Sequence, residues 1–86
     1  MARDVLHDLL LLGPPERDRL LEAVDAFAAT GSVAETARRT FCHRNTVLNR
    51  LRRVAECTGL DLTVPEQATV LLLGLAAWRQ HERRSS

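Results

Sequence analysis

The residues best suited to chemical recognition stand together near the middle of the chain, in the run His43-Arg44-Asn45-Thr46. Arginine can donate two hydrogen bonds to a guanine, asparagine can pair with an adenine, and threonine can contact a phosphate or the methyl group of a thymine. These residue types, gathered within one helical turn, indicate contact with DNA. We expect base contacts from His43, Arg44, Asn45 and Asn49. We expect phosphate contacts from Ser32, Thr46, Arg50 and Arg53.

A short helix is predicted immediately before this run. Ser32 and Glu35 have the spacing of a capping box, in which both side chains bond to the backbone at the start of a helix, so the helix should begin at Val33. Its inward positions would be Val33, Ala34 and Ala37. The small side chain of Ala37 would let a second helix cross closely, because a larger one would push the two backbones apart.

A longer helix is predicted from Arg44 onward, after residues 40–42 break the helical period. Apolar residues then recur at the spacing of one buried helix face, which would carry Val47, Leu48, Leu51, Val54 and Ala55. The opposite face would carry Asn45, Thr46, Asn49, Arg52, Arg53 and Glu56. A short helix, a tight turn and a longer helix with a basic outer face describe a helix-turn-helix over residues 32–57, whose second helix, residues 44–57, would enter the DNA major groove.

The stretch ETARRTFCHRNTVLNRLRRVAECTGLDL carries a resemblance to a known family. It is similar to the C-terminal helix-turn-helix of the PucR-type transcriptional regulators, which include the purine catabolism and sugar diacid regulators, and more distantly to the Fis-type DNA-binding domain. The similarity covers roughly residues 20–75, and its most specific parts are His43-Arg44-Asn45-Thr46, Arg50-Leu51 and Thr58-Gly59-Leu60-Asp61-Leu62. The chain departs from the family pattern at Thr40, where Leu is usual, at Cys42, where Val or Ile is usual, and at Asn49, where an aromatic residue is common. The resemblance implies a homodimer on paired half-sites, and a sensor domain outside this chain that responds to a small molecule.

The composition indicates a single all-α domain over residues 1–86. Hydrophobic residues make up 45% of the chain, which suffices for one modest core. With only two Phe, one Trp and no Tyr, that core would consist of Leu, Ala and Val. No run of residues favours a strand, so we expect a small four- or five-helix bundle that contains the helix-turn-helix.

The net charge of +1 conceals an uneven distribution. Residues 32–57 contain six Arg and two Glu, a net charge of +4, whereas residues 1–31 contain three Arg and six acidic residues, a net charge of −3. The positive charge therefore lies on the predicted DNA-reading unit. All twelve Lys and Arg positions are Arg, which suits bidentate contacts with phosphates and bases but fits a bias in genomic composition equally well.

Metal, enzyme and membrane functions find little support in the sequence. Cys42 and Cys57 form no CxxC pair and His7, His43 and His81 are scattered, so we expect neither a metal nor a cofactor. Neighbours in sequence such as Cys42 and His43 rarely point together as a nucleophile and its base, so we expect no catalysis. The apolar runs are too short for a membrane span, and we expect a cytoplasmic protein without a membrane partner.

Two helices are predicted before the helix-turn-helix. Residues 1–13 would hold an N-terminal helix over residues 4–12, or a linker to a missing sensor domain. A second helix would begin at Pro15, because proline suits the first helical position, and would run to about Ala29 before Gly31 stops it. We expect the chain to be a domain cut from a longer regulator.

A last helix is predicted over residues 63–82, after Gly59 caps the recognition helix. Thr63 and Glu66 have the spacing of another capping box, and the tail after residue 82 would fray. This helix contains the run VLLLGLAAW, which is apolar almost all round. Such a helix is either a central core helix or a surface shared with a second subunit.

Two functions remain open from the sequence. The first is a sequence-specific DNA-binding domain of a transcriptional regulator, which double-stranded DNA and a second copy of the chain would contact. The alternative is a helical dimerisation or protein-interaction module without DNA binding, whose basic face only provides solubility. The inward Ala37, the short turn and the run HRNT favour the first.

Overall fold

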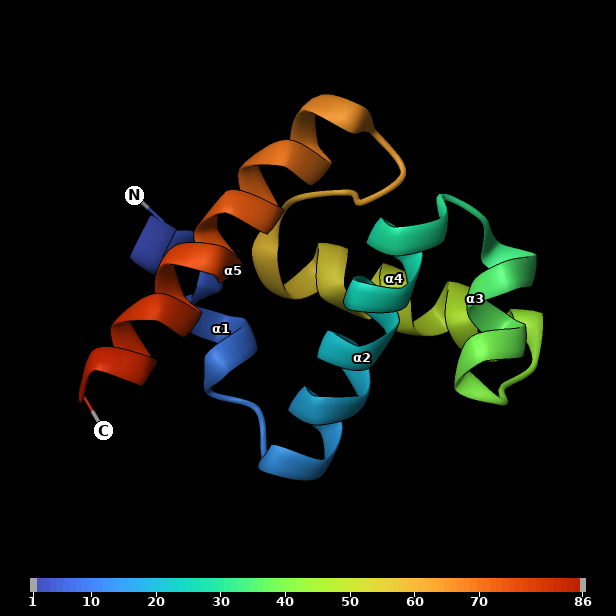
Figure 1. Cartoon of the computed structure of the whole chain (residues 1–86), viewed down its shortest axis with the longest axis horizontal. Helices are drawn as coiled ribbons and strands as arrows, with labels where there is room; N and C mark the ends of the chain where they lie inside the picture. The colour runs from blue at the N-terminus through green and yellow to red at the C-terminus, as the bar shows by residue number, and fades with distance from the viewer. Residues whose placement is uncertain (1, 86) are drawn as a thin grey trace.

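The computed structural model describes residues 2–85, which form five α-helices with no strand among them. The helices are α1 (Ala2–Leu10), α2 (Pro14–Thr30), α3 (Val33–Thr40), α4 (Arg44–Thr58) and α5 (Pro65–Ser85), as Figure 1 shows. The predicted all-α fold with a helix-turn-helix is therefore confirmed. Met1 at the start of the predicted N-terminal segment and Ser86 at the end of the predicted tail lie outside the described residues.

One hydrophobic core joins all five helices. It consists of Leu6, Leu9, Leu20, Leu21, Ala23, Val24, Ala37, Val47, Leu51, Val54, Leu62, Leu71 and Leu75. Helix α4 packs against α1, α2 and α3, while α5 packs against α1 on the side away from α3 (Figure 1). Because three helices hold α4, its apolar face cannot rotate, and the direction of its outer face is set.

Helices α2 and α4 end in the same way, each with a threonine followed by a glycine. Gly31 and Gly59 adopt left-handed backbone conformations, with φ of 66° and 74°, which glycine reaches without a steric cost. The hydroxyl of Thr30 donates to Ala26 O at 3.0 Å, and that of Thr58 donates to Val54 O at 2.8 Å. The two predicted glycine stops are confirmed, and the threonine hydroxyls secure the last turns ahead of them.

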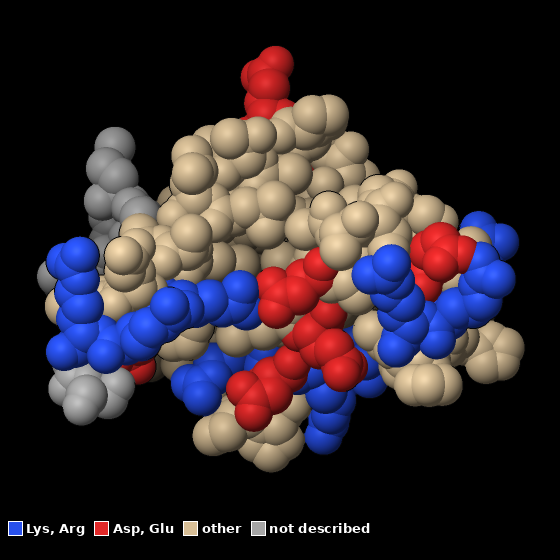
Figure 2. Space-filling model, viewed as in Figure 1, with Lys and Arg blue, Asp and Glu red and all other residues tan. Residues whose placement is uncertain are grey.

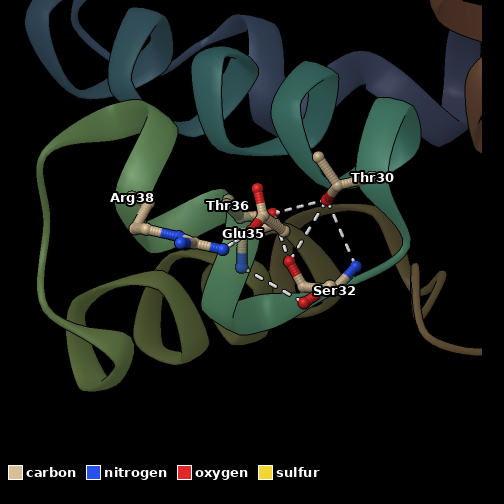
Figure 3. Close-up of polar contacts among 5 residues, drawn as sticks. All are labelled: Thr30, Ser32, Glu35, Thr36 and Arg38. Carbon is tan, nitrogen blue, oxygen red and sulfur yellow. Dashed lines mark hydrogen bonds and ion pairs between the residues drawn. The ribbon is translucent and has the colours of Figure 1, made fainter.

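The start of α3 confirms half of the predicted capping box. Ser32 Oγ accepts a hydrogen bond from the backbone N–H of Glu35 at 3.1 Å (Figure 3). The carboxylate of Glu35 does not return the bond, because it forms an ion pair with Arg38 instead. The backbone N–H of Ser32 donates to Thr30 Oγ1 at 3.2 Å, so the end of α2 replaces the missing half of the box.

The inward face of α3 differs from the prediction. Ala34 is exposed, and Thr36 is fully buried beside Ala37. The hydroxyl of Thr36 donates to Ser32 O at 2.8 Å and lies 3.2 Å from Thr30 Oγ1 (Figure 3). A buried hydroxyl is tolerated when it is hydrogen-bonded. The polar link between α2 and α3 therefore lets Thr36, which was not predicted to face inward, lie in the interior.

The start of α5 also differs from the prediction. Asp61 Oδ1 accepts hydrogen bonds from Thr63 Oγ1 at 2.6 Å and from the Thr63 backbone N–H at 2.8 Å, and these two bonds lower the pKa of Asp61. Thr63 is therefore held in the turn, the helix begins at Pro65, and the box with Glu66 was wrong. The helix then continues to Ser85, so residues 83–85 of the tail expected to fray are helical.

Candidate nucleic-acid interface

A three-residue turn, 41–43, joins α3 to α4 and sets the angle between them. Phe41 has a left-handed backbone, with φ of 55° and ψ of 42°. This geometry lets the backbone N–H of Cys42 donate to Ala37 O at 2.9 Å, which closes the last turn of α3. Ala37 is buried, as predicted for an inward position of α3.

Phe41 lies in this turn and was not predicted as a site residue. Its side chain is 95% exposed, and it is the sole non-glycine residue with a positive φ among the described residues. A left-handed conformation costs a bulky L-residue about 1 to 2 kcal/mol. The turn therefore holds a strained and nearly uncovered aromatic residue beside the predicted reading residues.

Replacing Phe41 with asparagine should raise the free energy of unfolding by about 0.5 to 1 kcal/mol, because asparagine tolerates the left-handed conformation better. Little packing is lost, since the ring is exposed. Thermal denaturation should show a rise in Tm of a few degrees. Leu11→Asn is the matched control, because Leu11 is 70% exposed without a positive φ, and its Tm should not rise. A lower Tm for Phe41→Asn would mean that the ring stabilises the fold.

The four predicted base-contact residues all reach solvent. His43 precedes the first turn of α4, Arg44 and Asn45 stand in that turn, and Asn49 follows one turn later; all four are exposed. Asn49 Oδ1 accepts a hydrogen bond from Arg52 Nη1 at 3.0 Å. The structure therefore gathers these side chains on the outer face of α4 and at its N-terminal end, which is the end that reads base edges in helix-turn-helix proteins.

The four predicted phosphate-contact residues differ in their exposure and in their partners within the chain. Ser32, Thr46 and Arg50 are half-buried, and Arg50 Nη1 donates to Cys42 Sγ at 3.3 Å. Arg53 is exposed, but its Nε lies 3.2 Å from Glu16 Oε2 on α2. The hydrogen bond to this carboxylate raises the pKa of the Arg53 guanidinium.

A groove of about 330 Å³ between α2 and α4 collects several of these side chains. It is lined by Glu16, Arg19, Leu20, Thr46, Asn49, Arg50 and Arg53. Three arginines and one glutamate give the groove a positive excess, which suits an anion. Arg19 and Glu16 were not predicted as site residues, because no local pattern indicates which face of α2 lies beside α4.

Leu48 does not face the core as predicted. The buried residues of α4 are Val47, Leu51 and Val54, whereas Leu48 is 39% exposed. At about 100° per residue, Leu48 lies roughly 90° from the middle of the buried face, so it falls at the edge of the exposed face. Ala55, which was also predicted to face inward, is half-buried.

Charge is separated between the helices. Residues 36–55 contain six Arg at 38, 39, 44, 50, 52 and 53 and no acidic residue. Helix α2 carries Glu16, Asp18, Glu22 and Asp25. Figure 2 looks onto the side of α2 and α5, where acidic groups gather across the middle between basic groups. Asp25 binds Arg79 of α5 with two hydrogen bonds of 3.0 Å, so part of the acidic charge on this side is matched within the chain.

Within residues 2–85, no helix is long and apolar enough to cross a membrane. The same residues bring together no group of three His, Cys, Asp or Glu side chains that could hold a metal ion. Cys42 and Cys57 are free thiols, and burial raises the pKa of Cys57.

Two helices joined by a tight turn and packed on a common core, the second with an outer face of exposed basic and amide side chains, define a helix-turn-helix protein of the DNA-binding kind. Residues 20–77 match the family described as the PucR C-terminal helix-turn-helix domain. The chain belongs to this family.

The chain is also similar to three individual proteins, two known by sequence and one by a solved structure. The chain is similar to the uncharacterized proteins Rv2242 of Mycobacterium tuberculosis and Mb2266 of Mycobacterium bovis, each 42% identical over 69 residues, which cover 79% of this chain and 16% of the relative. It is also similar to the crystal structure of a regulator of polyketide synthase expression from Bifidobacterium adolescentis, with 38% identity and a TM-score of 0.81, over 93% of this chain and 33% of that one. The chain thus spans about a sixth of the curated relatives and a third of the solved protein.

Proposed function

We propose that this chain binds specific duplex DNA sequences as the reading part of a transcriptional regulator, with α4 in the major groove. The observation that carries this proposal is the exposed group His43, Arg44 and Asn45 at the N-terminal end of α4. These side chains offer the donors and acceptors that base edges require. The solved relative described as a regulator of expression supports the same role.

In this proposal, His43, Arg44, Asn45 and Asn49 contact bases. Ser32, Thr46, Arg50 and Arg53 contact phosphates. Ser32 stands at the N-terminus of α3, where backbone N–H groups and the helix dipole favour an anion. Arg50 and Arg53 line the groove beside α2, so they would hold the sugar-phosphate backbone at the edge of α4.

The proposal includes a homodimer formed through α5. Residues 67–78 of this helix carry no charged side chain, and Figure 2 shows an uncharged surface above the band of charges. Val70 is 51% exposed and Leu73 is 67% exposed, three positions apart on one helix face. A two-fold dimer would set two recognition helices about 34 to 36 Å apart, which matches successive turns of the duplex.

In this proposal the regulator acts in the cytoplasm, and this chain binds no cofactor. Any small-molecule effector would bind a sensor domain outside this chain.

Binding to a labelled random-sequence duplex over a series of salt concentrations tests this function. Each phosphate that an arginine neutralises contributes about −0.9 to the slope of log affinity against log salt, so Arg50 and Arg53 predict a slope of about −2 for one recognition unit. Fluorescence anisotropy measures the affinity at each concentration. Affinity that does not depend on salt, or no binding at low salt, would contradict the proposal. Self-association without any DNA binding would instead support the interaction module.

A further inference from the structure

Leu48 is an aliphatic side chain on a helix face that is otherwise polar. It lies one turn after Arg44 and one turn before Arg52, and both of these arginines are exposed. Side chains four positions apart on a helix are neighbours, with about 5 to 6 Å between their Cβ atoms. Arg44, Leu48 and Arg52 therefore form one row along α4, beside the row of Asn45 and Asn49.

The position of Leu48 is set by the core. Val47, which precedes it in the sequence, and Leu51, about one turn later, are both buried, and α4 is packed against three other helices. A side chain on such a helix is held more precisely than one on a loop, as a residue that selects among base pairs requires. Leu48 is 39% exposed, and a partner can still cover this exposed part.

We propose that Leu48 contacts the 5-methyl group of a thymine and thereby determines specificity at one base pair of the binding site. This inference rests on the proposed function, because it requires α4 in the major groove. Thymine is the one standard base that presents a methyl group there. A leucine facing another base edge would cover hydrogen-bonding groups without satisfying them, which is unfavourable. In this row, Arg44 would therefore contact polar groups of a base, and Leu48, one turn later, would contact the methyl group.

The test uses duplexes recovered by selection from a random library with the whole chain. Each thymine of the recovered site is replaced in turn with uracil, which removes the methyl group and nothing else. We expect one replacement to weaken binding about fourfold, the ratio that burial of one methyl group supplies. This measurement on the unaltered protein requires no variant to fold.

Variants then assign the methyl contact to a residue. Leu48→Ala should bind the thymine duplex more weakly and should no longer distinguish it from the uracil duplex. Leu11→Ala is the matched control, because Leu11 is 70% exposed and lies outside α4 and α5, and this variant should keep the fourfold ratio. Circular dichroism should show unchanged helicity in both variants.

Two results overturn the inference while the proposed function stands. One is that the protein selects a defined site but no uracil replacement changes its affinity. The other is that Leu48→Ala keeps the full thymine preference. A protein that selects no duplex at all overturns the proposed function together with this inference, and that outcome is seen at the selection step before any thymine is replaced.

Discussion

Replacing Arg44 with alanine should weaken binding to the selected duplex by about 1 to 3 kcal/mol, a factor of roughly five to one hundred or more. Arg44 is exposed in the first turn of α4, so the change removes a base contact and leaves the core intact. Binding to a random duplex should fall much less, because base edges supply little of that affinity. The measurement is the ratio of affinities for selected and random duplexes.

Arg53→Ala is the matched comparison, because it removes an arginine of the same helix that is proposed to contact phosphate. It should weaken binding to all sequences alike and lower the salt slope by about one. Glu16→Gln should do the reverse and strengthen binding to all sequences, since the carboxylate that holds Arg53 at 3.2 Å would no longer compete with phosphate. If Arg44→Ala reduced selected and random binding equally, the base contact assigned to Arg44 would be wrong.

Replacing Leu73 with glutamate should divide a dimer into monomers. Leu73 is 67% exposed on α5, so a charge there is tolerated in the monomer but is unfavourable when buried against a second copy. Sedimentation should show a dimer for the unaltered chain and a monomer for the variant. Affinity for paired half-sites should fall by about a hundredfold or more, because the second half-site no longer adds to the first.

Leu11→Glu provides the control for this change, since Leu11 is similarly exposed and lies outside α5. This variant should remain dimeric and should keep its affinity. Circular dichroism of both variants checks that helicity is unchanged. A monomeric unaltered chain at high concentration, together with selected sites that are not paired, would rule out the dimer and leave the apolar face of α5 for another domain of the protein.

The sequence by itself determined the features that depend on neighbours a few positions apart. Gly31 and Gly59 end their helices as predicted, and Ser32 caps α3. The apolar period also located α4 and the polar face that carries Arg44 and Asn45. Each of these features depends on residues within about four positions of one another, so residue type and spacing are enough to predict it.

Only the tertiary structure decided whether the residues at the edge of each apolar helix face are buried or exposed. Periodicity assigned Ala34 and Leu48 to the interior, but the packing partners of α3 and α4 leave both exposed. Thr36 is buried because the end of α2 supplies Thr30 as a neighbour for its hydroxyl. A pattern gives the direction of a buried face, whereas its width depends on which other helices cover it.

The electrostatics of the interface were likewise decided by packing. Arg53 and Glu16 are 37 positions apart, and no local signal joins them, yet the packing of α2 on α4 places them in one groove. Helix α5 begins at Pro65 and not at Thr63 as predicted, because the side chain of Asp61 accepts a hydrogen bond from the Thr63 backbone and holds Thr63 in the turn. Residue types therefore predicted which side chains are suited to DNA, while the packing of helices distant in sequence determined which of those side chains are exposed and which already have a partner.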